Sequence, residues 1–340
     1  MPESKPESMF ESVSESTAGK AATSDVAIPD QAGPVPVAVV EGAVVAEAGP
    51  APGRPRSLWS DAWHDLRRKP SFVISALIIL LLLVMAAFPS LFTSGDPRAG
   101  DLSNFYLRDP QLTHFFSPEW LGYNQQGQSV YARMIYGTRA SIIIGISVTA
   151  LVFVFGSLVG MLAGYFGGVL DALLSRLTDV FMGIPFLLGT MVILVSFETR
   201  TEWTVTFALA FLGWTTIARV MRGSVISVKQ SDYVAAARSL GAGTWRILLR
   251  HILPNAVAPV IVVATIALGG YITAEAILSY LGIGLSEPAI SWGGDINRAQ
   301  DQIRVAEHIL LFPSILLSIT ILSFLMLGDA VRDALDPKLR

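Results

Sequence analysis

The sequence contains no cysteine and few residues that carry charge or bind metal ions. The missing cysteines exclude disulfides, cysteine-ligated metals and thiol catalysis within this chain. Only four histidines occur, widely scattered, so a histidine-rich metal site is not expected. Charged residues make up 15% of the chain and hydrophobic residues 52%. Because soluble domains carry about 25% charged residues, this composition indicates a membrane protein.

The chain also lacks an ATP-binding motif and the residues of a membrane-embedded enzyme. No G-x-x-x-x-G-K-[ST] segment occurs, so the chain does not carry its own phosphate-binding loop. Its apolar stretches hold serine and threonine but no histidine, and a single well-buried acid, which disfavours an intramembrane hydrolase. The net charge of −3 says little about partners, and neither a metal nor a nucleic-acid partner is expected.

Residues 1–57 contain almost no aromatic side chains and are predicted to form a disordered cytoplasmic tail. Glutamates recur every four residues at its start and would stack like charges on one helix face. The Pro, Ala, Val and Gly that follow cannot bury enough surface to offset the entropy of ordering. Because no basic start and apolar run open the chain, we do not expect a signal peptide.

Residues 58–70 have a different pattern. Trp59, Trp63 and Leu66 fall on one helical face, and charged residues lie elsewhere. This pattern predicts an amphipathic helix that lies in the membrane interface. A solvated linker that contains two tryptophans is the alternative.

Six apolar stretches are long enough, or nearly so, to cross a membrane, which takes about 20 residues. The third and fourth are short, and we expect them to extend to about Leu173 and Val220. The predicted spans are Phe72–Phe92, Ala140–Leu170, Phe181–Phe197, Trp203–Ala218, Ala256–Leu281 and Ile309–Gly328. They predict an all-α integral membrane protein with a first transmembrane helix at 71–92, an extracellular segment at 93–139 and a core of five transmembrane helices at 140–340.

The orientation follows from lysine and arginine. With the N-terminus inside, fifteen such residues lie in inner segments and seven in outer ones, leaving out the remote Lys5 and Lys20. Since cytoplasmic loops carry the excess of positive charge, we expect both termini in the cytoplasm. The loop 222–255 then faces the cytoplasm, and residues 282–307 face outward.

Small residues in the second span predict close helix packing. Glycines recur every four residues, which leaves one helix face without side chains. These glycines are Gly156, Gly160, Gly164 and Gly168. Pro185 and Pro313 lie inside spans, where each removes a backbone hydrogen bond and favours a kink, for a gate or as a static bend.

Glu275 is the one carboxylate well inside an apolar span. Because burying a charge in a membrane costs a few kcal/mol, this side chain should face a polar cavity or a partner. One interpretation is a residue that lines a translocation path, and the other is a structural hydrogen bond near the outer end of the helix. Asp171, Arg176 and Asp179 lie at the inner interface, where a local ion pair is expected.

The loop between the fourth and fifth spans has the pattern of two short helices. Ser231 or Asp232 can cap a helix that starts at Tyr233, and Gly241 suits the left-handed position that ends one. Three small alanines would let this helix sit deep in a groove on another protein. Such order argues against a generic basic loop on anionic lipid, which is the alternative.

Thr244 can cap the second helix, and Pro254 marks the entry to the fifth span. Arginines share one face of this helix, and apolar side chains supply a second surface. The candidate contact residues of the whole loop are Tyr233, Val234, Ala235, Ala236, Ala237, Arg238, Leu240, Gly241, Ala242, Trp245, Arg246 and Arg250.

This loop resembles the cytoplasmic loop of ABC-importer permeases, which has an Ala-Ala pair, a nearby Gly and a Leu-Pro at a fixed distance. Ala236-Ala237, Gly241 and Leu253-Pro254 match, whereas Ala235 stands where that pattern often has Glu and His251 where it often has Ile.

Other segments are similar to the second, C-type permease of dipeptide, oligopeptide and nickel importers. They are Tyr136–Arg139, Ala163–Gly168, Tyr280–Gly284, Ser291–Gly293 and Leu327–Pro337. The segment Leu121–Ser129 departs from the family, because it is neutral where the usual Leu-Gly-Thr-Asp-x-x-Gly-Arg-Asp is charged. We therefore expect different external contacts there, to a binding protein or a sister permease.

The resemblance implies the type I ABC importer permease fold, with six transmembrane helices, an interfacial N-terminal helix and a coupling-helix loop. It implies a place in a bacterial plasma (inner) membrane, among lipid, with a sister permease, two ATPase subunits and an extracellular substrate-binding protein. ATP and Mg²⁺ would then belong to the ATPase subunits, docked at Tyr233–Pro254, so this chain is expected to hold no cofactor and not to be an enzyme.

The resemblance favours di- or oligopeptides as cargo, with nickel or another small solute as the alternative. From the residues alone, an ion-coupled secondary transporter and an intramembrane enzyme remain as remote alternatives. The former would rely on ionisable relays inside the membrane, and the spans contain almost none.

Overall fold

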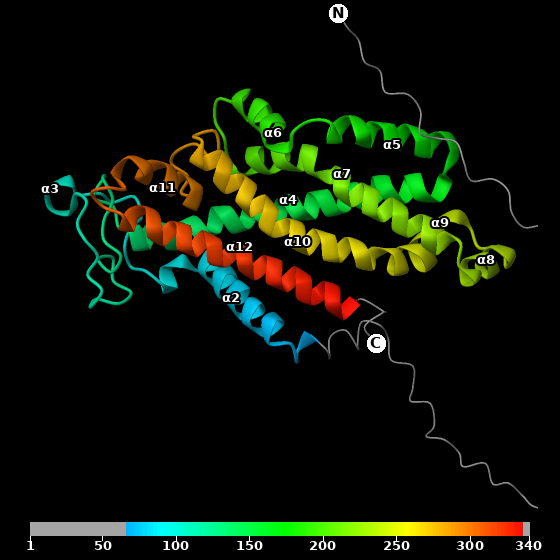
Figure 1. Ribbon diagram of the computed structural model, residues 1–340, viewed down its shortest axis with the longest axis horizontal. Coiled ribbons are helices and arrows are strands. Elements are labelled where there is room, and N and C mark those ends of the chain that lie inside the picture. The colour runs from blue at the N-terminus through cyan, green and yellow to red at the C-terminus, as the bar shows by residue number, and fades with distance from the viewer. Residues whose placement is uncertain (1–65, 336–340) are drawn as a thin grey trace, which may run out of the picture. The chain divides into compact units, whose positions relative to one another are not determined.

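The structure is a computed structural model that describes residues 66–335, all within one compact unit (Figure 1). Within these residues no strand forms, and one isolated antiparallel bridge joins Tyr123 to Ser129. The predicted tail and residues 58–65 of the predicted interfacial helix lie outside the described residues.

Helices make up most of the described chain. The longer ones are α2 (Pro70–Ala87), α4 (Val130–Phe166), α5 (Gly168–Met182), α6 (Phe186–Val195), α7 (Glu202–Lys229), α10 (Leu253–Tyr280) and α12 (His308–Leu335). The shorter ones are α3 (Leu102–Phe105), α8 (Asp232–Ser239), α9 (Thr244–Ile247) and α11 (Trp292–Ala299), with 3₁₀ turns at Pro89–Leu91 and Gln300–Gln302 and a π turn, η2, at Leu248–Ile252.

Five helices in the described chain are long and apolar enough to cross a membrane: α2, α4, α7, α12 and the continuous run Thr244–Tyr280. Helices α5 and α6 pass the same test as a pair, bent by 81°. The predicted third span is therefore broken, and Pro185 stands at the break as the residue before α6. A proline there lacks the N–H that a continuous helix would use.

Capping groups, and not hydropathy, set where helix α4 begins and ends. The predicted second span, Ala140–Leu170, is wrong at both ends. Helix α4 begins at Val130, because the Ser129 hydroxyl accepts a hydrogen bond from the Ala132 N–H (3.2 Å). It ends at Phe166, because Gly167 takes a φ of +67°. The other predicted spans contain the right apolar cores but miss the ends.

Two contacts show that the broken pair makes one crossing. At one end of the bundle, the Lys229 ammonium donates to the Tyr165 carbonyl, which joins the end of α7 to the end of α4. At the other end, the Arg200 N–H donates to the Ser286 hydroxyl (3.0 Å), beyond the end of α10. The chain from Gly167 to Arg200 therefore passes from one end to the other, which makes six crossings. We call the end of the bundle at Lys229 the α8 end and the end at Arg200 the α11 end.

Helices α4 and α7 pack so closely that their contact leaves no room for a side chain. A Cβ atom on Gly160 would lie 2.2 Å from the Ala218 carbonyl oxygen. Cβ atoms on Gly156 and Gly164 would lie 2.7 Å and 2.8 Å from the carbonyl oxygens of Trp214 and Arg222, respectively. The predicted role of these three glycines in helix packing is therefore confirmed.

The same prediction is wrong for Gly168. This residue lies beyond α4, at the first position of α5, with a φ of +56°. A Cβ atom there would meet nothing within 4 Å. Gly168 serves the turn between two helices, because a positive φ disfavours a side chain.

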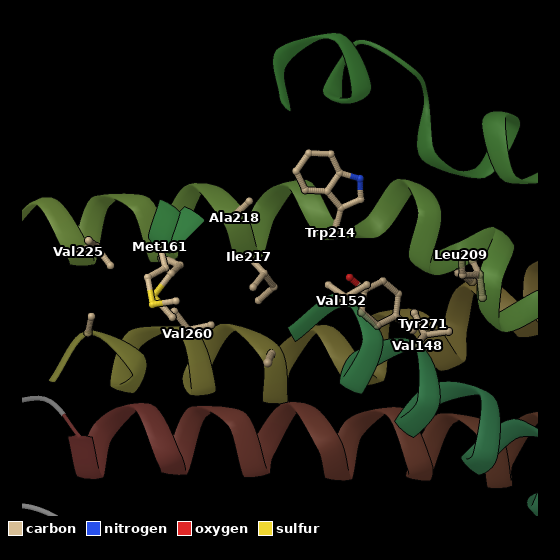
Figure 2. Close-up of a cluster of buried hydrophobic side chains, with 14 of the residues drawn as sticks. Val148, Val152, Met161, Leu209, Trp214, Ile217, Ala218, Val225, Val260 and Tyr271 are labelled. Carbon is tan, nitrogen blue, oxygen red and sulfur yellow. The ribbon is translucent and has the colours of Figure 1, made fainter. Parts of the chain in front are cut away.

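One apolar core fills the space between α4, α7 and α10. Figure 2 shows Met161, Ile217 and Val260 reaching from these three helices into the same space. Trp214 projects from another side of α7, toward α5, where its ring centroid lies 5.4 Å from that of Phe181. This core therefore joins the broken span to the long helices.

A second core lies among α2, α4, α11 and α12. Its members include Leu82, Ile142 and the fully buried Trp292, whose indole N–H donates to the Met134 carbonyl (3.0 Å). Helix α2 packs on α12 and α4 in the described chain, so it lies at the edge of the bundle, opposite α5 and α6 (Figure 1).

We expect Gly160→Ala to destabilise the helix bundle, because the added methyl group meets the backbone of α7. Overpacking of this kind costs about 1–3 kcal/mol. Thermal unfolding of the purified protein in detergent measures the change. Gly223→Ala is the matched control, since a Cβ atom at this helical position meets nothing within 4 Å and should be neutral or stabilise α7 by up to about 1 kcal/mol. Equal unfolding temperatures for both variants would contradict the close packing.

Candidate functional site

The loop at the α8 end folds into two short helices joined by a glycine turn. Helix α8 ends with the Gly241 N–H donating to the Arg238 carbonyl (3.0 Å) and the Ala242 N–H to the Ala237 carbonyl (3.1 Å). This pair of bonds is a Schellman motif, and Gly241 has the left-handed φ that it requires, +80°. The predicted glycine turn is therefore confirmed.

Both predicted caps of this loop need correction. Helix α8 begins at Asp232 and not at Tyr233, and Ser231 precedes it without a side-chain capping hydrogen bond. Thr244 is the first residue of α9, and Gly243 occupies the capping position. A glycine is accepted there because the capping residue has a non-helical backbone.

The second helix of the loop is not separate from the fifth span. Helix α9 passes through the π turn η2 directly into α10, so residues Thr244–Tyr280 form one continuous helical run. Pro254 lies in the first turn of α10, and the wider π turn before it accommodates the missing N–H. Pro254 therefore marks the entry to the fifth span as predicted, although the helical run is not interrupted there.

One side of the loop packs on the bundle. Val234, Ile247, Leu248 and Ile252 are fully or almost fully buried and belong to the main core. Ala237 is also buried. These contacts hold α8 and α9 in place on the bundle, because each buried side chain loses contact with water.

The other side of the loop exposes apolar and basic side chains, which we call the loop surface. Leu240 is 87% exposed at the tip, an unusual position for a leucine in a folded loop. Ala235, Ala236 and Gly241 are exposed beside it and carry little or no side chain. The remaining members of the loop surface are Tyr233, Arg238, Trp245, Arg246, Leu249 and Arg250.

The break between α5 and α6 leaves backbone groups without partners. Within residues 66–335 no hydrogen bond reaches the carbonyl oxygens of Met182–Ile184 or leaves the N–H groups of Phe186–Leu188. Gly183, Ile184 and Pro185 are exposed in this chain. With 15 residues in α5, the break lies about 22 Å along the span from the α8 end. Unpaired backbone at such a depth occurs only where protein covers it or water reaches it.

Glu275 is fully buried where α10 meets α4. Its carboxylate accepts hydrogen bonds from the hydroxyls of Ser279 (2.8 Å) and Ser141 (3.1 Å). Hydrogen bonds of this kind are what the second interpretation of Glu275, a structural role, predicts. That Glu275 lines a translocation path stays a prediction.

The comparisons with known proteins agree with this arrangement. Residues 156–340 match the family described as binding-protein-dependent transport system inner membrane component, which is more than half of the chain. The chain belongs to this family of membrane permeases. Residues 57–110 also match the N-terminal TM domain of oligopeptide transport permease C. The permease is therefore a multi-pass inner membrane protein.

Curated relatives match the permease along most of its length. The glutathione transport system permease protein GsiD of Pectobacterium atrosepticum is 34% identical over 84% of this chain and 93% of the relative. The oligopeptide transport system permease protein OppC of Bacillus subtilis is also 34% identical, over 84% and 91%. The dipeptide transport system permease protein DppC of the same species is 34% identical over 84% and 87%.

Among solved structures, the inward-facing MetNI methionine ABC transporter is similar to the permease. Its chain is 19% identical, with a TM-score of 0.48, and the match covers 59% of this chain and 96% of that one.

The neutral segment Leu121–Ser129 makes contacts inside the permease. The Asn124 amide group donates to the Gln128 side-chain oxygen (3.1 Å), which also accepts from the Arg133 guanidinium (2.8 Å). Arg133 in turn donates to the buried Asp295 carboxylate (2.6 Å). The neutral residues therefore build the turn before α4 and hold a buried ion pair.

Sequence reasoning missed the ion pairs that join α5 to α7. Asp171 and Asp179 were expected to pair locally with Arg176. Instead, the Arg222 guanidinium donates two hydrogen bonds to Asp171 (2.5 and 2.7 Å), and Arg219 pairs with Asp179 (3.2 Å). The partners are far apart in the sequence, so no spacing rule could have found them.

We expect the two α5–α7 ion pairs to differ in strength. The Arg222–Asp171 pair is bidentate and partly buried, so a double-mutant cycle with Arg222→Gln and Asp171→Asn should give about 1.5–3 kcal/mol. The Arg219–Asp179 pair is more than half exposed, and the same cycle should give at most about 1 kcal/mol. Thermal unfolding of the purified protein measures both. A larger coupling for the exposed pair would contradict this ranking.

Proposed function

We propose that this permease is one subunit of an ATP-driven importer of di- or oligopeptides. The names of OppC and DppC, both 34% identical to this chain, support peptides as the cargo class. The permease would form half of the translocation pathway and pair with a different, sister permease. An extracellular binding protein would deliver the peptide, and two ATPase subunits would hold ATP and Mg²⁺.

We place the α8 end in the cytoplasm. Its basic residues support this orientation, because cytoplasmic segments carry the excess of lysine and arginine. They are Arg176, Arg219, Arg222, Lys229, Arg238, Arg246 and Arg250. The Lys69–Asp333 ion pair (3.1 Å) joins the start of α2 to the last turns of α12, so both described chain ends would lie on the cytoplasmic side.

The loop surface would dock in a groove of the ATPase. Its exposed Leu240 and Trp245 suit apolar anchors, and the small Ala235 and Ala236 allow close approach of another backbone. The observation that carries this proposal is the continuous helical run Thr244–Tyr280, which joins the loop surface to the opposite end of the bundle. A displacement of α9 by the ATPase would therefore move the whole of α10.

The broken span α5–α6 would line the path of the peptide. Its open carbonyl and N–H groups are the kind of groups that pair with water or with a peptide backbone. Coupling then requires that ATP binding favour one arrangement of the two permeases, since a ligand shifts an equilibrium only by its differential affinity. The outward-facing arrangement would expose the path to the binding protein.

Gly241→Val tests the coupling role of the loop. Valine in the left-handed conformation costs about 1–2 kcal/mol, which lowers the population of the docked turn roughly 5- to 30-fold. We expect the reconstituted complex to lose peptide uptake while its ATPase subunits still hydrolyse ATP. Uptake of labelled peptide per ATP hydrolysed, in proteoliposomes, measures this.

Gly241→Asn is the matched control, because asparagine tolerates the left-handed conformation and no neighbour lies within 4 Å of a Cβ atom there. This variant should keep most of its uptake. Uptake by Gly241→Val equal to that of the wild type would count against the coupling role. Loss of uptake in both variants would show that any added side chain at Gly241 disturbs the docking surface, whatever the conformation of the turn.

Ile184→Cys tests the path. The chain has no cysteine of its own, so the new thiol is unique in this subunit. We expect a membrane-impermeant methanethiosulfonate reagent to label it in the assembled complex, at rates that differ with and without ATP, because the thiolate forms only in contact with water.

Leu77→Cys, on the exposed apolar face of α2, is the control that should stay unlabelled. The wild-type complex gives the background from cysteines of other subunits. If Ile184→Cys stayed unlabelled in every nucleotide state, the break would be covered by protein and would not line the path.

A further inference from the structure

The loop between α3 and α4 carries large apolar side chains that the bundle does not bury. Phe115 is 67% exposed and Phe116 is 65% exposed. Their ring centroids lie 5.7 Å and 5.1 Å from that of Trp120, which packs on Tyr131 at the start of α4 (5.1 Å). We call Phe115, Phe116 and Trp120 the aromatic patch. The rings of Phe115 and Phe116 are mostly exposed, whereas the Trp120 ring packs on Tyr131.

The backbone of the patch is unusual for its residues. Phe116 has a φ of +62°, a conformation that a bulky side chain rarely adopts. Strained residues of this kind persist where surrounding structure holds them and often mark functional surfaces. Here the strain does not serve burial, because the ring it positions is mostly exposed.

The position of the patch relates it to the first span. The Tyr131 hydroxyl donates to the Phe92 carbonyl (2.8 Å), just beyond the end of α2. Phe88 and Leu91, in the same turn, are also exposed. The patch therefore lies near the level where α2 ends. Aromatic rings are enriched at this level in membrane proteins, between hydrocarbon and headgroups.

Polar groups close the loop behind the patch. The Gln111 N–H donates to the Glu119 carbonyl (3.2 Å), and the Glu119 carboxylate lies 3.7 Å from the His114 ring nitrogen. An exposed apolar patch with a polar rim is typical of a surface that contacts a membrane or a partner.

We propose that the loop Gln111–Trp120 is an interfacial membrane anchor. The rings of Phe115 and Phe116 enter the headgroup region of the leaflet at the α11 end, beside the end of α2. A lipid surface fits better than a protein partner, because α2 lies at the edge of the bundle, away from the broken span α5–α6, and its exposed face is aliphatic. The anchor holds the end of the first span at a constant depth.

The experiment uses the assembled complex in vesicles of phosphatidylethanolamine and phosphatidylglycerol. Single cysteines replace Phe115 or Leu112, which is also exposed in this loop, and carry a nitroxide spin label. Power saturation by oxygen, which concentrates in the bilayer, and by a nickel chelate, which stays in water, gives the depth of each label. The labelled wild-type complex supplies the background.

Two exposed leucines provide the reference depths. Leu81→Cys on α2 marks the hydrocarbon, and Leu102→Cys on α3 marks water, although Leu102 is as exposed as Leu112. We expect the labels at Phe115 and Leu112 to respond to oxygen more than to nickel, at a depth between the two references. Equal depth at Phe115 and Leu102 would overturn the proposal. Weak response to both reagents at Phe115 would also overturn it, since a protein partner would then cover the patch.

A second variant separates anchoring from folding. Phe116→Asn keeps the left-handed turn, because asparagine tolerates it, but removes the exposed ring. In this background the label at Leu112 should shift toward the aqueous reference, while the complex still assembles. An unchanged depth at Leu112 would show that the rings do not hold the loop in the membrane.

Discussion

The architecture depends on the backbone contact between α4 and α7. Where Gly160 faces the Ala218 carbonyl, the two helices approach until no Cβ atom fits between them. In a membrane, lipid tails offer apolar side chains nearly the same environment as a protein interior, so association relies on close van der Waals contact. The glycine face supplies this contact along three successive turns of α4. The core with α10 and the ion pairs to α5 are built around it.

The same contact places the two parts of the molecule to which we assign roles in transport. The end of α7 leads into α8, whose buried Val234 belongs to the core that α4 and α7 share. The ion pair between Arg222 and Asp171 joins α7 to α5, the first half of the broken span. The loop surface and the backbone break are thus attached to one rigid pair of helices. A displacement at the loop would be transmitted through packed helices, because the helical run Thr244–Tyr280 is continuous.

Hydrogen-bond satisfaction explains which polar groups lie where. Glu275 and Arg133 are buried, and each has partners from more than one segment of the chain. The carbonyl oxygens of Met182–Ile184 have no partner in the described chain, and these residues are exposed there. A membrane tolerates the first arrangement in its interior, because the charge or dipole is compensated locally. It tolerates the second only against another protein or water. The contrast distinguishes groups that stabilise the fold from groups that we propose to face a path.

The sequence alone determined the membrane class, the six apolar cores, the glycine packing face and the glycine turn at Gly241, because each depends on local composition or short spacing. The ends of the helices followed less well, since Ser129 and Gly167 override hydropathy. Only the tertiary structure decided the α5–α6 break, the continuity of α9 with α10, and the partners of Asp171, Glu275 and Arg133. Arg222, Ser141 and Asp295 lie far along the chain from Asp171, Glu275 and Arg133, their respective partners. A pattern of neighbouring residues carries no information about which distant helix will face it.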